Sequence, residues 1–149
     1  MRFTRLRVAL ALAAALLAAG ALPASAAMAK TVHVVERATT DAVTNGSKED
    51  RAGNVLTWHN KIHDAKNERQ VGRDAGYCVR TVVGKSWECA WTTFLKSGSI
   101  MVQGPFSDTG STVLAITGGT GAYADAHGTM TLKYHNKKGT AFDLIFHLQ

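Results

Sequence analysis

Short runs of β-branched and apolar residues, separated by glycines, make up the segment from Gly98 to Leu132. Runs of this kind at short, regular intervals are typical of strands in an all-β meander. Three glycines within Gly118–Gly121 interrupt the segment at its centre. Because glycine lacks a Cβ, this cluster indicates unusual backbone angles or a close approach of two chain segments. The segment therefore predicts strands joined by a sterically demanding turn.

Similar runs continue on both sides, and no stretch has the periodicity of an amphipathic helix. About eight strands are predicted in all, over residues 31–37, 55–59, 77–83, 87–95, 100–103, 113–117, 129–134 and 140–148. Eight antiparallel strands can close into a barrel that is filled by side chains or holds one small ligand. Apolar residues alternate along the last strand, but the pattern leaves open which face lines the lumen.

The first 26 residues have the pattern of a secretory signal peptide. A basic start precedes an apolar stretch over residues 8–22, and Ala24-Ser25-Ala26 forms a small-residue cleavage site, with cleavage after Ala29 as the alternative. The apolar stretch is shorter than the roughly 20 residues that span a bilayer. We therefore expect a secreted protein without a membrane span, in which residues 27–149 form a single domain.

Charge excludes one class of partner. Three of the 17 lysines and arginines lie in the predicted leader, which leaves 14 against 11 acidic residues and a net charge of only +3. No basic residues cluster into a patch beyond the pair Lys137-Lys138. We therefore expect no nucleic-acid partner.

The two cysteines of the chain, Cys78 and Cys89, flank a predicted hairpin centred on Val83-Gly84. Directly opposed residues of a hairpin lie close enough for a disulfide to form. Export to an oxidising compartment favours that bond. A free core thiol and a reactive cysteine are the alternatives that the pattern leaves open.

Three blocks of sequence, in order, carry a family resemblance. They are Gly53-Asn-Val-Leu-Thr-Trp-His-Asn-Lys-Ile62, Ala75-Gly-Tyr-Cys-Val79 and Ile116-Thr-Gly-Gly-Thr-Gly-Ala-Tyr123. They resemble strands and a turn of the allene oxide cyclase family and, more distantly, of the dirigent proteins. The resemblance covers about residues 32–148. It implies an eight-stranded antiparallel barrel, assembled as a homo-oligomer (a trimer or a dimer), that acts without a cofactor on a hydrophobic small molecule.

The resemblance also indicates two site residues. Asn60 matches a cyclase asparagine that faces the ligand, although a strand-end asparagine that bonds a turn is the alternative. The cyclases open an epoxide with a glutamate on their first strand, and Glu36 lies near that position. The alternative is a surface glutamate paired with Arg37 or Lys30. Glu36 and Asn60 are therefore the candidate catalytic residues.

Four aromatic residues on the predicted strands are candidates for the wall of a ligand site: Trp58, Trp87, Trp91 and Phe106. Phe106 replaces a cyclase tyrosine, and His127 stands where dirigent proteins commonly have arginine. Both departures argue against either family's own reaction.

His59 and His63 are four residues apart, which on a strand separates them by about 13 Å. No third ligand is indicated, so we expect no metal site.

The sequence thus favours a secreted barrel that guides the cyclisation or stereoselective coupling of a hydrophobic small molecule, as an isomerase-type cyclase or in the manner of a dirigent protein. A non-catalytic extracellular barrel, with a ligand-binding or structural role, is the alternative.

Overall fold

The computed structural model describes residues 30–43 and 49–149. The predicted signal peptide, residues 1–26, lies outside this part of the chain. Nine strands and one 3-10 helix are present in the described residues. They are β1 (Lys30–Arg37), β2 (Ala42–Val43), β3 (Val55–Asp64), β4 (Gln70–Val82), β5 (Ser86–Leu95), β6 (Gly98–Ser107), β7 (Thr112–Gly119), η1 (Gly121–Tyr123), β8 (Gly128–Tyr134) and β9 (Ala141–Leu148).

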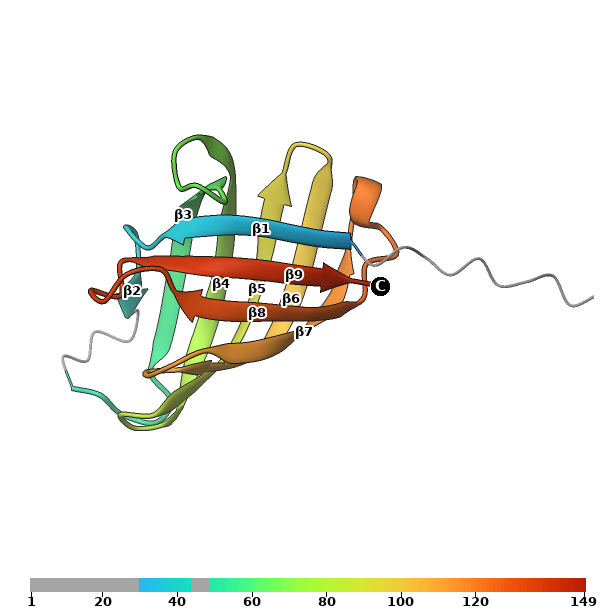
Figure 1. The fold of residues 1–149 in the computed structure, drawn as a ribbon. Helices are drawn as coiled ribbons and strands as arrows, with labels where there is room; N and C mark the ends of the chain where they lie inside the picture. Colours follow the sequence, from blue (N-terminus) through green and yellow to red (C-terminus); the bar gives the residue numbers. More distant parts are fainter. Residues whose placement is uncertain (1–29, 44–48) are drawn as a thin grey trace, which may run out of the picture.

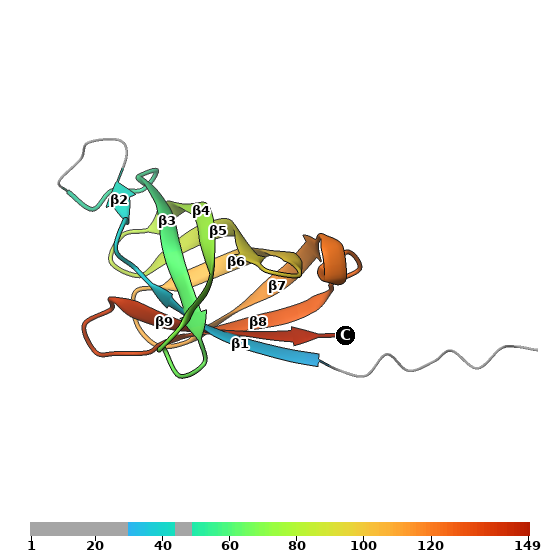
Figure 2. The ribbon, with the colours of Figure 1, turned by 90° about the horizontal axis from the view of Figure 1, so that it is seen from above.

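Eight of these strands close into a barrel. From β3 to β9, each strand pairs antiparallel with the next along the chain, and β9 then pairs with β1. The second edge of β1 pairs with β3, so that the ring is complete (Figures 1 and 2). The two-residue strand β2 adds to β3 outside the ring. The prediction of an all-β, eight-stranded antiparallel barrel is confirmed, because no edge of β1 or β3–β9 is left without a partner strand.

Three strands are markedly longer than the sequence pattern predicts: β6 spans Gly98–Ser107 rather than residues 100–103, and β3 and β4 are extended as well. Strand β3 continues past His59 to Asp64, and β4 begins at Gln70 rather than near Tyr77. The added portions contain glycine and buried polar residues, including Asn60 and Asp74. Such residues have low strand propensity, and here pairing between β3 and β4 overrides that propensity.

Side chains fill one part of the barrel. The bulkiest fully buried residues are Phe146, Ile62, Ile100, Leu114, Met130 and Leu144. Two of them belong to β9, where the apolar residues at even positions from 142 to 148 all face inward and are buried. At one end of the barrel, η1 lies beside Lys30 and the C-terminal residues, and its Tyr123 is buried. The cavity described below opens at the other end, where β1 finishes and β9 begins.

Cys78 and Cys89 are directly opposed in the β4–β5 pairing and form a disulfide. Both residues are buried on the inner face of the barrel. The predicted bond is therefore present, and among the described residues no cysteine is free.

Loss of this disulfide is expected to destabilise the fold. The bond joins residues 11 positions apart, and closing a loop of that size stabilises by about 3 kcal/mol in the chain-entropy model. A reducing agent or the double variant Cys78→Ala/Cys89→Ala should therefore lower the melting temperature by several degrees, as measured by circular dichroism. Equal melting of oxidised and reduced protein would contradict the prediction.

Candidate functional site

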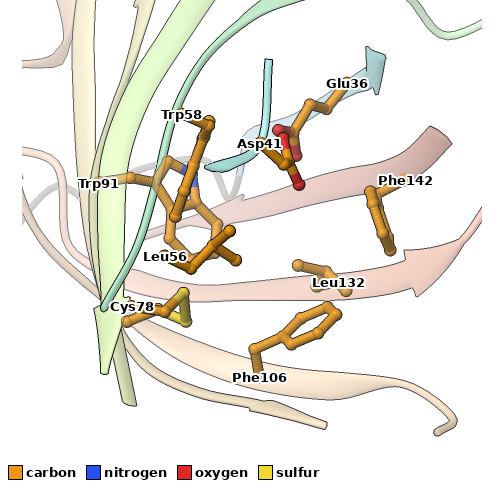
Figure 3. Close-up of a pocket in the computed structure, with 10 residues that line it drawn as sticks. Glu36, Asp41, Leu56, Trp58, Cys78, Trp91, Phe106, Leu132 and Phe142 are labelled. Atoms are coloured by element: carbon orange, nitrogen blue, oxygen red, sulfur yellow. A yellow bond between two sulfur atoms is a disulfide. The ribbon is translucent and has the colours of Figure 1, made fainter. Parts of the chain in front are cut away.

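A cavity opens at the end of the barrel where β1 finishes (Figure 3). The volume available to the centres of water-sized molecules is about 80 Å³, several times what a single water needs. Its lining residues come from seven strands and from the segment before β2, and they are Glu36, Asp41, Leu56, Trp58, Cys78, Cys89, Trp91, Phe106, Leu132 and Phe142. The wall is therefore apolar except for two acids.

Aromatic rings form much of this wall. Trp58 and Trp91 meet edge to face, with ring centroids 5.8 Å apart. Phe106 and Phe142 meet in the same way, also at 5.8 Å, and Tyr134 packs against both. Edge-to-face pairs fix ring orientation, so the wall has a defined shape.

Three of the four predicted wall residues, Trp58, Trp91 and Phe106, lie around this cavity. The structure places Trp87 elsewhere. The Cζ atom of Arg80 lies 3.9 Å from the centroid of the Trp87 indole ring. The indole N–H donates a hydrogen bond to Asp108 at 3.1 Å. Trp87 therefore supports the β4–β5 end of the barrel and does not line the cavity.

Glu36 lies near the end of β1 with its side chain inside the barrel and only 7% exposed. Its carboxyl accepts a hydrogen bond from the Asn60 amide at 2.7 Å. The alternative of a surface glutamate paired with Arg37 or Lys30 is therefore wrong. Burial raises the pKa of Glu36 to about 7, an effect to which the nearby Asp41 adds and which the Asn60 hydrogen bond partly offsets. A carboxyl with this pKa can both give and take a proton near neutral pH.

Asn60 holds the acids in place. Its Nδ2 donates to Glu36 and to Asp41, each at 2.7 Å. Its Oδ1 accepts from the backbone N–H groups of Thr39 and Thr40 and from the Thr40 hydroxyl. Asn60 is 1% exposed and is not among the residues that line the cavity. The side chain therefore positions Glu36 and fixes the segment between β1 and β2, in the middle of a strand and not at its end.

Sequence analysis missed a third acid, Asp74. This residue of β4 is fully buried, lies opposite Asn60 in the β3–β4 pairing, and has no hydrogen-bond partner on either carboxyl oxygen. The pKa of Asp74 is raised well above its usual range, mainly by burial and next by the charge of Glu36. The Trp58 indole and the backbone N–H of Asn60 lie near the carboxyl and lower its pKa in part, but neither forms a hydrogen bond of good geometry with it. Counting back by twos from the inward-facing Cys78 reaches Asp74, so strand alternation contained the signal.

The two buried acids predict an unusual dependence of stability on pH. Both pKa values are raised in the folded state, so the folded protein retains protons that the unfolded chain releases. Their contribution to stability is complete below about pH 4.5 and is lost as pH rises, through about pH 7 for Glu36 and beyond for Asp74. Relative to wild type, Glu36→Gln should therefore gain several degrees in melting temperature between pH 4.5 and pH 8.

Differential scanning fluorimetry across that pH range would measure the effect. Glu88→Gln on the outer face of β5 is the matched control, because Glu88 is exposed. The prediction fails if the melting difference between Glu36→Gln and wild type is independent of pH.

The two histidines considered as metal ligands do not converge. His59 is exposed, whereas His63 is buried and its pKa is lowered by burial and by the neighbouring Arg37. Within residues 30–43 and 49–149, no group of three histidine, cysteine or acidic side chains is arranged to hold a metal ion. The same residues contain no helix that is long and apolar enough to cross a membrane.

Known proteins resemble this barrel. The family model described as allene oxide cyclase matches residues 29–142. A solved structure named pyocyanin demethylase is 25% identical, covers 80% of this chain and 100% of its own, and superposes with a TM-score of 0.67. A pterocarpan synthase dirigent protein (15% identity, 81% and 96% coverage) and an exo-specific intermolecular Diels-Alderase (12%, 80% and 97%) each give a TM-score of 0.64. At identities of 15% and 12%, the last two comparisons show only that the fold is shared.

Proposed function

Because the chain belongs to the allene oxide cyclase family, we propose that the barrel binds one hydrophobic small molecule in its aromatic cavity and guides the cyclisation or stereoselective coupling of that molecule. Glu36 is the acid–base group of this proposal. The observation that carries it is the position of this carboxyl: buried, held by Asn60, and on the wall of an otherwise apolar cavity with a pKa of about 7.

The chemistry follows from that arrangement. The Glu36 carboxyl transfers one proton to or from the substrate, the activated substrate closes or couples, and the proton is then returned, so that Glu36 ends in its starting state. No net proton or electron is gained or lost in a cyclisation or an addition of this kind, so such a step balances without a cofactor, whereas an oxidative coupling would have to start from a substrate already oxidised elsewhere. The fixed rings of Trp58, Trp91, Phe106 and Phe142 hold the substrate in one conformation, which selects one stereoisomer.

We extend the proposal to the site of action and the assembly. The leader pattern of residues 1–26 and the disulfide support a secreted protein. A homotrimer, with a dimer as the alternative, is supported by Tyr77 of β4 and Met101 of β6, which are 53% and 38% exposed beside a shallow groove on the outer face. Light scattering coupled to size-exclusion chromatography should give the mass of an oligomer, and a monomer would overturn this part.

One observation favours the non-catalytic alternative. Six large apolar side chains fill the rest of the lumen, so the cavity is small compared with the 300–1,000 Å³ common for ligand pockets. A barrel of this kind can bind a small ligand without transforming it, or serve a structural role.

Native mass spectrometry of the protein purified from its own host separates these functions. A retained small molecule that the wild-type protein converts to a cyclised or coupled product supports catalysis. A molecule that is retained but returned unchanged supports binding alone, and an empty barrel favours a structural role. Pyocyanin belongs in the same assay, since a structural neighbour at 25% identity is named for its demethylation.

A further inference from the structure

Every ionisable side chain that lines the cavity is an acid. Glu36 and Asp41 lie next to each other (Figure 3), and no lysine, arginine or histidine is among the lining residues. The Asn60 amide donates to both carboxyls. The polar end of the cavity is therefore suited to a positive group and not to an anion.

Asp74 adds a third carboxyl behind this pair. It faces the same amide residue across the β3–β4 pairing, is fully buried, and is unpartnered on both oxygens. A buried carboxyl without a hydrogen bond or a counter-charge is costly. Its neighbour in β5, Thr93, is also fully buried and has no hydrogen-bond partner for its hydroxyl. The fold thus maintains an acidic cluster, Glu36–Asp41–Asp74, at a cost that a bound cation would offset.

No side chain of the described residues supplies that cation. The arginines on the surrounding strands are engaged elsewhere: Arg37 bonds Asn67, Arg73 lies over Phe94, and Arg80 pairs with Asp50 and Asp108. His33 and His135 bond Asp143, and His63 is buried beside Arg37. Lys61 and Lys133 are exposed. None of them appears among the causes that shift the pKa of Glu36 or Asp74. Within residues 30–43 and 49–149, the acidic cluster therefore has no counter-charge.

The wall favours an organic cation over a metal ion. Four aromatic rings line the cavity together with the acids, those of Trp58, Trp91, Phe106 and Phe142. Aromatic faces attract cations, and most strongly where water is excluded. A metal ion would need several converging ligands, and the described acids, histidines and cysteines offer no such arrangement.

We propose, building on the function proposed above, that the substrate of this site is an organic cation, with its flat or apolar body among the aromatic rings and its positive charge beside the Glu36–Asp41–Asp74 cluster. The cluster then provides charge recognition, and the proton released when the cation binds leaves Glu36 ready to act as a base.

Two probes of equal size, one a cation and the other neutral, test the proposal. 1-Methylpyridinium and toluene have the same shape and differ in charge. Isothermal titration calorimetry at pH 8 should show 1-methylpyridinium binding at least about tenfold more tightly than toluene. Its affinity should rise from pH 5.5 to pH 8, because ionisation of Glu36 favours a cation. Titrations at pH 6 in two buffers of different ionisation enthalpy should show release of about one proton.

Variants locate the effect. Glu36→Gln and, separately, Asp41→Asn should reduce the preference for 1-methylpyridinium severalfold while toluene still binds, because both acids line the cavity and the aromatic wall is intact. Glu88→Gln removes an exposed acid of the same type and should retain the full preference. Because each site variant is tested alone, misfolding of one still leaves the other to decide.

The outcomes distinguish the two proposals. Equal affinity for both probes, or tighter binding of toluene, overturns the inference of a cationic substrate and leaves an apolar binding cavity. If neither probe binds the wild-type protein, the function proposed above fails, and this inference fails with it. A cation preference that survives both Glu36→Gln and Asp41→Asn also overturns the inference, because the charge would then be recognised elsewhere.

Discussion

Replacement of Glu36 by glutamine is expected to lower turnover of the barrel's substrate by about a hundredfold or more, the usual loss when a general acid–base group is removed. Glutamine keeps the size of the side chain, and its Oε1 can still accept the Asn60 hydrogen bond seen at 2.7 Å. It cannot give or take a proton. The variant should therefore bind the substrate and leave it unconverted.

Product formation would be followed by mass spectrometry with the molecule recovered from the native protein. The circular dichroism spectrum reports whether the fold is intact, and Glu88→Gln provides an acid-to-amide control on the outer face. Asn60→Ala should also slow turnover, and in addition lower stability, because it leaves Glu36, Asp41 and the N–H groups of Thr39 and Thr40 without a partner. Unchanged rate and product chirality in Glu36→Gln would remove this residue from the mechanism.

The second large effect concerns folding. Gly119→Ala is expected to destabilise the barrel by about 3 kcal/mol or more, or to prevent folding. Gly119 ends β7, and a Cβ at this position would lie 2.2 Å from the carbonyl oxygen of Tyr123 and 2.5 Å from that of Ser99. Both obstacles are backbone atoms, so neither can move without displacing η1 or β6. Thr120 also bonds Ser99 here, through its N–H at 2.9 Å.

Gly110→Ala is the matched comparison. Its backbone has a φ of +78°, but no atom lies within 4 Å of the position that a Cβ would take. The cost there is the conformational strain alone, about 1 kcal/mol. Urea denaturation of the two variants would measure the difference between a steric clash and a strained turn. Similar losses for Gly119→Ala and Gly110→Ala would show that close packing at the end of β7 is not decisive.

Alternation and turn residues were sufficient to predict most of the barrel. The division of β9 into two faces and the opposition of Cys78 and Cys89 both follow from counting in twos along a strand, and the structure then shows which face of β9 points inward. The glycines after Ile116 indicated a close approach, and the structure places the backbone of η1 against Gly119. The ends of β3 and β4 could not be predicted this way, because their buried polar residues break the apolar pattern on which the count depends.

For the functional site, the sequence indicated some features and the tertiary structure decided others. The sequence by itself indicated an antiparallel barrel, the opposition of Cys78 and Cys89, and Glu36 and Asn60 as candidate site residues, because these depend on local patterning and on motifs read in order. Only the tertiary structure decided that Glu36 is inside, that Trp87 lies away from the cavity, and that Asp74 joins the acids. The reason is barrel closure: pairing of β1 with β3, and of β3 with β4, brings Asn60 and Asp74, which are 24 and 38 positions along the chain from Glu36, close to that residue. No local pattern specifies that register.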